Sequence, residues 1–232
     1  MLYVAYRPRE SQDKIGLPTS IHRTFTEEFN EKKPMEGIYS GNWHRYNRLQ
    51  NGVSVPEELR LPAKLFMVCK GLKRFIPDVY FDDLREWIVS TQFLSFLKEH
   101  RLLEGHYEES ELTVLSTTKK PITDKSYHLL RFFRFDNELV DFEHTPKVIS
   151  PKKPLTKHTP PMVYYSELLF HQDAQVPPMF ILDDCSYWRS FFCSEEIKAA
   201  IEQEAFLGFN LYTITDFVQE RLEREQRFVG PG

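Results

Sequence analysis

Three side chains near the C-terminal end of the chain have the types and the order that metal-assisted hydrolysis requires. Asp184 is followed by Glu196 and Lys198, the Asp…Glu-x-Lys order found in many metal-dependent nucleases. In such enzymes the carboxylates hold the metal ion and the amine orients the attacking water at the end of a strand. Here Glu196 and Lys198 come directly after Ser194, and a serine before acidic residues is typical of the start of a helix. A nuclease therefore stays as the alternative interpretation, not the preferred one.

Two Asp-Asp pairs, Asp82-Asp83 and Asp183-Asp184, are the other candidates for metal or proton chemistry. Consecutive side chains of a strand point to opposite faces, so such a pair is a poor chelate unless it lies in a turn. Each pair follows an apolar strand-like run, which favours a turn whose Asp side chains cap backbone N–H groups. We therefore expect no catalytic residue, no metal site and no cofactor.

The remaining composition also favours a binding protein over an enzyme. The chain lacks His-Glu-x-x-His, Cys-x-x-Cys, Gly-x-Ser-x-Gly and glycine-rich phosphate-loop motifs. Cys69, Cys185 and Cys193 are widely spaced among apolar neighbours, which favours buried free thiols. A net charge of −4 over 232 residues argues against a nucleic-acid partner. Neither a signal pattern nor an apolar run of about 18 residues is present, so we expect a cytoplasmic protein that binds no membrane.

The elements that would position these residues repeat along the sequence. Residues 77–87 and 178–188 both read Pro, three residues, an apolar residue, Asp-Asp, three residues and Trp. A helix-opening serine follows each Trp, and then come an apolar pair, a glycine and a strand-like run. Such an echo indicates one module present twice. The residues that would anchor it structurally are Asp82, Asp83, Trp87, Asp183, Asp184 and Trp188.

The predicted fold is α+β, with two similar strand-turn-helix-strand lobes and helices packed on mixed sheets. Residues 2–6 and 64–70 predict strands, and the run 112–116 predicts another after the first helix. Residues 1–145 would form the N-terminal lobe, with an irregular region at 7–62, and residues 162–232 the C-terminal lobe. One compact domain overall is the other possibility.

The segment 146–161 between these lobes contains five prolines, four lysines and no acidic residue. Proline lacks a backbone N–H and fixes φ, so this composition predicts a stiff basic connector without regular structure. The connector could also contact an acidic partner.

Several of these segments together resemble the immunity proteins of bacterial polymorphic toxin systems, most nearly the family called immunity protein 43. The resemblance covers about residues 64–218 and lies in Trp87-Ile88-Val89-Ser90, Tyr127–Phe132, Asp141-Phe142-Glu143, Pro178–Asp183 and Ser194–Lys198 followed by Gly208-Phe209. It implies a cytosolic protein that binds the C-terminal domain of a cognate toxin and blocks its active site. It names no toxin-contacting residue.

Two surfaces are candidates for that contact. One is the acidic stretch Glu104, Glu108, Glu109 and Glu111, which a basic nuclease toxin would attract, although a solvated loop explains it as well. The other contains Trp43 and Tyr46, aromatic residues of the kind that anchor interfaces, although core packing explains them equally. An interaction module without a toxin is a further alternative, and the sequence does not predict the oligomeric state.

Overall fold

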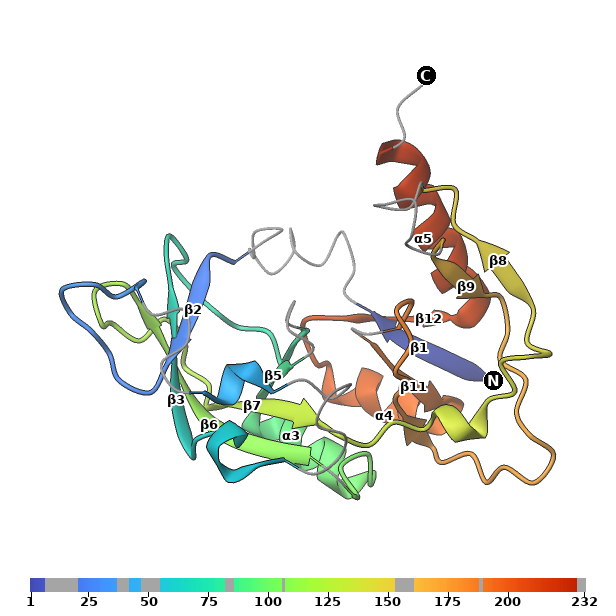
Figure 1. The fold of residues 1–232 in the computed structure, drawn as a ribbon, viewed down its shortest axis with the longest axis horizontal. Helices are drawn as coiled ribbons and strands as arrows, with labels where there is room; N and C mark the ends of the chain where they lie inside the picture. The colour runs from blue at the N-terminus through green and yellow to red at the C-terminus, as the bar shows by residue number, and fades with distance from the viewer. Residues whose placement is uncertain are drawn as a thin grey trace. The chain divides into compact units, whose positions relative to one another are not determined.

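The chain folds into two units that draw on distant parts of the sequence. The computed structural model describes residues 1–6, 21–36, 42–46, 55–81, 86–105, 107–152, 161–187 and 190–228. Unit 1 comprises residues 1–6, 135–204 and 210–232, and unit 2 comprises residues 7–134 and 205–209. The helices pack on one mixed and one antiparallel sheet (Figure 1), which confirms the α+β class. The lobe boundaries expected from the sequence stay a prediction.

Unit 2 is built on a six-stranded sheet of order β2-β3-β6-β7-β5-β4. β3 and β6 are parallel and the other neighbours are antiparallel. Its strands are β2 (Arg23–Thr26), β3 (Lys64–Cys69), β4 (Val79–Phe81), β5 (Trp87–Ser90), β6 (Tyr107–Ser116) and β7 (Tyr127–Phe132). β2 lies inside the region expected to be irregular, which corrects that expectation.

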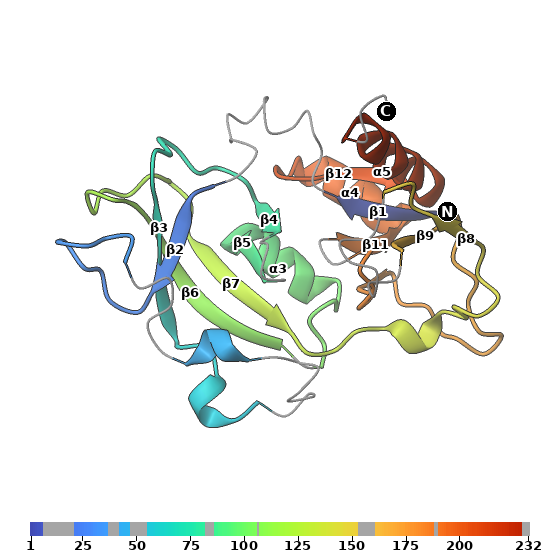
Figure 2. The same ribbon diagram turned by 45° about the horizontal axis from the view of Figure 1, so that its top comes forward.

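The two faces of this sheet are covered differently. Because side chains alternate along a strand, Ile88 and Leu129 point to one face and Trp87 and Leu130 to the other. The first face joins a core that includes Trp43, from the short 3-10 helix η1 (Trp43–Arg45). Helix α3 (Thr91–Glu99) contacts β5 and β7 on the opposite face (Figure 2). A second 3-10 helix, η2 (Glu57–Leu59), precedes β3.

Unit 1 is built on a four-stranded antiparallel sheet of order β10-β11-β1-β12. Its elements are β1 (Leu2–Tyr6), η3 (Asn137–Leu139), β8 (Lys147–Ile149), β9 (Val163–Tyr165), β10 (Met179–Phe180), β11 (Ser190–Ser194), α4 (Glu195–Glu204), β12 (Asn210–Thr213) and α5 (Ile214–Phe228). The strand expected at residues 2–6 is confirmed, and it lies in the middle of the sheet.

The helices α4 and α5 cover opposite faces of this sheet. The Tyr3 hydroxyl bonds Glu195 of α4, whereas the Tyr6 ring contacts Phe217 of α5 edge-on at 5.1 Å between centroids. Tyr3 and Tyr6 have opposite parity in β1, so their side chains lie on opposite faces. Figure 1 shows β1 between the two helices. Unit 1 is thus a helix-sheet-helix arrangement.

β8 and β9 form a separate two-stranded sheet of unit 1. β8 lies inside the proline-rich connector, so the expectation that this connector lacks regular structure is wrong at residues 147–149. Prolines flank this strand at positions 146 and 151 but do not interrupt it, which leaves the N–H groups of the intervening residues available. In both ribbon views β9 lies between β8 and α5 (Figures 1 and 2).

The two echoed segments have the same order of elements. The first runs β4, β5, α3, β6, and the second runs β10, β11, α4, β12, where the sequence predicted strand, turn, helix and strand. Ser90 caps α3 by accepting from the N–H of Phe93, and Ser194 accepts from the N–H of Ile197. Both predicted helix starts are confirmed, whereas descent from one duplicated module stays a prediction.

Candidate functional site

Three of the four residues of the acidic stretch lie at the start of a strand, and Glu104 lies in the connection between α3 and β6. β6 begins at Tyr107, five residues earlier than the run predicted from the sequence, so Glu108, Glu109 and Glu111 are strand residues. Their side chains alternate, with Glu108 on the face of Trp43 and Glu109 and Glu111 on the face of α3. The loop interpretation is wrong for Glu108, Glu109 and Glu111, because β6 pairs with β7 at these positions. The acids therefore do not form one continuous surface.

Each acid of this stretch is also close to a cation of the same unit. Glu104 lies 3.5 Å from Arg101, Glu111 2.9 Å from Lys64, and Glu109 2.9 Å from Lys98 of α3. Glu109 additionally lies 3.1 Å from the Nδ1 atom of His128. Their negative charge is thus partly neutralised within unit 2, which weakens its long-range field.

Glu108 belongs to a buried charged cluster around Arg131 of β7. The guanidinium lies 3.5 Å from Glu108 and 3.6 Å from Glu86, and its side chain is only 6% exposed. Burial raises the pKa of the Glu86 carboxyl to about 7 against the opposing effect of Arg131. Burial likewise raises the pKa of Glu108 and lowers that of Arg131, whose ionised form the two carboxylates favour. These groups are an internal ion cluster.

Trp43 and Tyr46 meet at the same guanidinium. Arg131 lies 5.7 Å from the Trp43 ring centroid and 5.1 Å from that of Tyr46, and it donates to the backbone carbonyl of Trp43 at 2.8 Å. Trp43 is 2% exposed, whereas Tyr46 is partly exposed and packs edge-on against Phe133. Trp43 is therefore a core residue of unit 2. The toxin-binding role expected for both stays a prediction.

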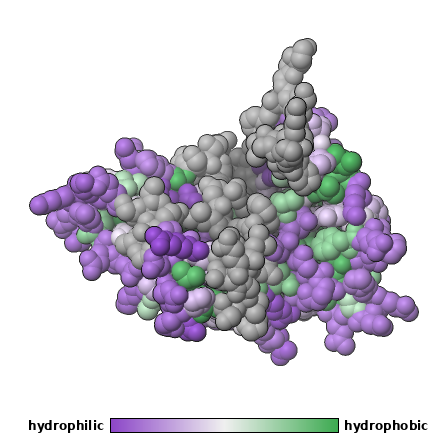
Figure 3. Space-filling view, in the orientation of Figure 1, coloured by the Kyte–Doolittle hydropathy of each residue, from purple (hydrophilic) through white to green (hydrophobic). Residues whose placement is uncertain are grey.

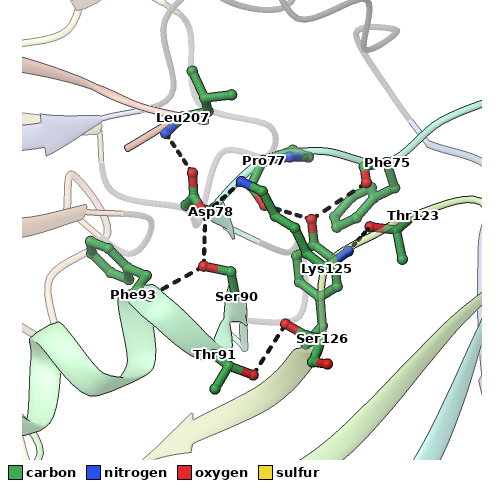
Figure 4. A network of polar contacts seen from close by, with 11 residues as sticks. Phe75, Pro77, Asp78, Ser90, Thr91, Phe93, Thr123, Lys125, Ser126 and Leu207 are labelled. Carbon is green, nitrogen blue, oxygen red and sulfur yellow. Dashed lines mark hydrogen bonds and ion pairs between the residues drawn. The ribbon is translucent and has the colours of Figure 1, made fainter. Parts of the chain in front are cut away.

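A second polar cluster of unit 2 centres on the buried Asp78 (Figure 4). One carboxylate oxygen accepts from Ser90 and from Lys125, each at 2.7 Å, and the other accepts from the N–H of Leu207 at 3.0 Å. The Leu207 carbonyl in turn accepts from the N–H groups of Asp78 and Val79. Asp78 thereby fixes the segment 205–209, 129 residues later in the chain, beside β4.

Two residues of the nuclease alternative, Asp184 and Lys198, contact different partners in the structure. Asp184 accepts from the N–H of Ser186 at 2.8 Å in the turn that the sequence predicted, and its other oxygen receives the Tyr165 hydroxyl at 3.5 Å. Lys198 contacts Glu202 and Glu195 and lies over the Tyr3 ring.

Glu196 is exposed in the first turn of α4. Within the described ranges, no group of three or more His, Cys, Asp or Glu side chains is placed so that it could hold a metal ion. The contacts of Asp184 and Lys198 are therefore those of a turn and of a helix.

The predicted anchors of the echoed segments are only partly described. Trp87 is buried against Phe81 and Phe132, as expected. Asp183 exchanges hydrogen bonds with the Asn137 side chain through its backbone. Asp82, Asp83 and Trp188 lie outside the described residues.

Sequence reasoning missed a cluster on the inner side of α5. The Glu225 carboxylate accepts from Ser150 at 2.5 Å and from the Tyr164 hydroxyl at 2.7 Å. Arg221 contacts the hydroxyls of Tyr164 and Tyr6 and lies over both rings. The partners are more than 50 positions apart, so no local pattern announces them. This cluster fastens the β8–β9 sheet to α5.

The cysteines are free, as expected, but one is not buried. Burial raises the pKa of the Cys69 and Cys193 thiols to about 12, so both are protonated at neutral pH. Cys185 is exposed, which corrects the expectation for that residue, because it lies in the turn after β10. Among the described helices, none has the length and apolar character needed to span a membrane.

Comparison with known proteins gives a family for the chain. No curated protein matches it. The family model of immunity protein 43 matches residues 9–221, which include most of both units and extend beyond the 64–218 range of the sequence resemblance. That match covers nearly the whole sequence, and the chain therefore belongs to the immunity protein 43 family.

Proposed function

We propose that this chain neutralises a cognate bacterial toxin by binding the toxin's C-terminal domain and covering its active site in the cytoplasm. The observation that carries the proposal is the family match over residues 9–221. The proposal assigns no chemical step to the chain itself. It also places the chain in a polymorphic toxin system, where each immunity protein is paired with one toxin domain.

The contacts of the candidate catalytic groups support a role without catalysis. Asp184 caps a turn, and Lys198 is shared between two glutamates of its own helix. Each contact is one that an ordinary helix or turn uses for its stability, so none requires a reaction to explain it. The nuclease alternative would instead need these groups to converge on one metal ion.

A blocking role sets a demand on affinity. A lethal enzyme is held inactive only by a complex of sub-nanomolar Kd, which corresponds to about 12 kcal/mol or more of binding free energy. Interfaces of ordinary size, about 1,600 Å² in total, reach such values when they contain a few well-packed anchors.

Of the acidic residues expected to contact the toxin, Glu104 and Glu111 are the ones that can be tested without disturbing the core. Glu108 belongs to the buried Arg131 cluster, so reversing its charge would disturb the core. Glu104 and Glu111 are more than half exposed and can be changed without this side effect. A basic toxin domain would be attracted by them, and their replacement by Lys should then slow association and weaken its salt dependence. Unchanged association rates would remove this surface from consideration.

The proposal predicts a toxin gene immediately upstream, and the direct test pairs the chain with the C-terminal domain that this gene encodes. We expect co-expression to protect cells from that domain and the two proteins to co-purify as a stable complex. Glu196→Ala combined with Lys198→Ala should leave protection intact. Metal-dependent cleavage of DNA or RNA by the purified chain, lost in this double variant, would establish the nuclease instead.

A further inference from the structure

The outer edge of β8 has backbone groups that no ladder among the described strands uses. β8 and β9 are antiparallel, and the Ser150 N–H donates to the Met162 carbonyl at 2.9 Å. Hydrogen-bonded and non-bonded pairs alternate in such a ladder, so Val148 and Tyr164 form the next bonded pair. The N–H and C=O groups of Lys147 and Ile149 therefore point away from β9. Among the described residues no backbone partner meets them.

The side chains at this edge are also available. Ile149 is 66% exposed, the highest value after Met1 for a large apolar side chain among the described residues. Lys147 and Lys152 are exposed, and neither forms an ion pair with an acidic residue of the described ranges. The space-filling view shows hydrophobic residues over β8 and β9, whereas hydrophilic residues dominate around β2 and β3 (Figure 3). An exposed apolar edge strand is a template for pairing with another chain.

The inner side of the same sheet is firmly held. Tyr164 is fully buried in the core of unit 1, and the half-buried Val148 packs against that core. Glu225 of α5 receives hydrogen bonds from Ser150, the residue after β8, and from Tyr164 of β9. Binding at this edge would consequently need little ordering of the strand, which lowers the entropic cost of association.

We propose that the outer edge of β8, at Lys147–Ile149, is a docking site for an edge strand of the toxin domain that carries acidic side chains. The added strand would bond to the N–H and C=O groups of Lys147 and Ile149, and its apolar residue would cover Ile149. This mode is β-augmentation. The inference rests on the proposed function, because it names the surface through which that function acts.

Charge decides the chemistry of the partner. Lys147 and Lys152 form no ion pair with a described acidic residue, and the sequence 146–161 contains no acidic residue. The acids of β6, in contrast, are already close to Lys64, Lys98 and Arg131. Unneutralised charges steer association more strongly than paired ones, so the lysine edge favours an acidic partner.

The test measures binding of the full-length chain to a catalytically inactive form of the C-terminal domain encoded upstream. Ile149→Pro removes an outward N–H group but no bond to β9, and its preceding residue is already extended. We expect Ile149→Pro to raise the Kd by about 10- to 100-fold. Lys147→Glu should lower the association rate by about tenfold at low salt. Ile149→Ser repeats the test with the backbone unchanged and guards against misfolding by proline.

Matched controls change the same chemistry elsewhere. Lys120→Glu reverses an exposed lysine in the turn after β6, and Val176→Ser removes an exposed apolar side chain of unit 1. Both should bind as the unchanged chain does. Equal Kd values for the Ile149 and Lys147 variants and the controls would overturn the docking site but leave the proposed function standing.

Three other outcomes count against the docking site. A failure of the unchanged chain to bind the upstream domain would overturn this site together with the proposed function. Self-association of the chain that Ile149→Pro abolishes, with toxin binding unaffected, would assign the edge to a second copy of the chain. Lysine-dependent binding of an oligonucleotide, with unaffected toxin binding, would likewise replace the proposed partner.

Discussion

The segment from β4 to β6 and the segment from β10 to β12 share an order of elements but complete their sheets in opposite ways. In unit 2 the neighbours run β4-β5-β7-β6, and in unit 1 they run β10-β11-β1-β12. In unit 2 the strand between β5 and β6 is β7, which comes directly after β6 in the sequence. In unit 1 the strand between β11 and β12 is β1, which comes well before its segment in the sequence. The same local elements thus require a partner strand, but the partner can come from either direction.

The connections after the two helices show how closely the segments correspond. α3 is followed by Arg101 at φ +62°, and α4 by Ala205 at φ +53°. An apolar pair comes next in both, and then a glycine, Gly105 at φ +110° and Gly208 at φ +114°. Left-handed residues end helices because they redirect the chain while satisfying terminal carbonyls. The surroundings of the two glycines nevertheless differ, so the correspondence can be tested by substitution.

Deletion of residues 1–6 should have the largest effect, because it removes the central strand of unit 1. β11 and β12 both pair with β1, and Val4 and Ala5 are fully buried. We expect amide hydrogen exchange in β11 and β12 to lose its protection, while β5 and β7 keep theirs. Val4→Thr, which buries a hydroxyl within an intact strand, should lower the free energy of unfolding by about 1–3 kcal/mol. Retained protection in β11 after the deletion would show that β1 is not the equivalent of β7.

Gly208→Ala should be the next most damaging change, and clearly worse than Gly105→Ala. A Cβ atom at Gly208 would lie 1.9 Å from the Val79 carbonyl oxygen, whereas one at Gly105 would meet the Arg134 side chain at 3.0 Å. Both substitutions strain a positive φ, at about 1–2 kcal/mol. The backbone clash should bring the cost at Gly208 to about 3 kcal/mol or more. Urea unfolding of the two variants measures the difference, and equal costs would contradict the close approach of residues 205–209 to β4.

The two capping serines should differ by a smaller amount. Ser90 caps α3 and also donates to the buried Asp78 carboxylate, whereas Ser194 has the capping bond at 3.3 Å and a partly exposed side chain. Ser194→Ala should lower the free energy of unfolding by about 0.5–1 kcal/mol, the usual value for a lost cap. Ser90→Ala should cost about 2–3 kcal/mol, since it also leaves a buried acceptor with one fewer donor. The corresponding Thr variants retain the hydroxyl and serve as controls.

The smallest expected difference concerns pH. The residue before Trp87 is Glu86, whose pKa is raised to about 7. The residue before Trp188 is Tyr187, a phenol that is already protonated at neutral pH and whose pKa burial raises further. A raised carboxyl pKa means that folded unit 2 binds more protons than the unfolded chain. Stability therefore falls as pH rises from about 4.5 to 7.

Glu86→Gln should reduce the loss of unfolding free energy between pH 5 and pH 8 by about 1–3 kcal/mol. Glu108 contributes a slope of the same sign and remains in the variant. Urea unfolding at several pH values provides the measurement. A variant with the same slope as the unchanged chain would exclude Glu86 as its source.

Much of this architecture was readable from local pattern. The apolar strands at residues 2–6 and 64–69, the capping serines and the turn at Asp184 depend on neighbours within a few positions. The start of β6 was not readable, because Glu108 and Glu109 give a polar run that is typical of a loop. Pairing with β7 and contacts to Arg131 and Lys98 stabilise the strand there, and those partners are distant in sequence.

The candidate surfaces show the same division. The sequence by itself determined where charges gather: acids at residues 104–111, lysines at 146–161, and an echo that places similar helices in two regions. Only the tertiary structure decided which of these charges are already paired, because an ion pair depends on distance in space and not along the chain. It placed the β6 acids beside cations, buried Trp43 under Arg131, and left the Lys147–Ile149 edge without a strand partner among the described residues. Burial and pairing are properties of the folded chain, and they separate a surface that can bind from one that holds the fold together.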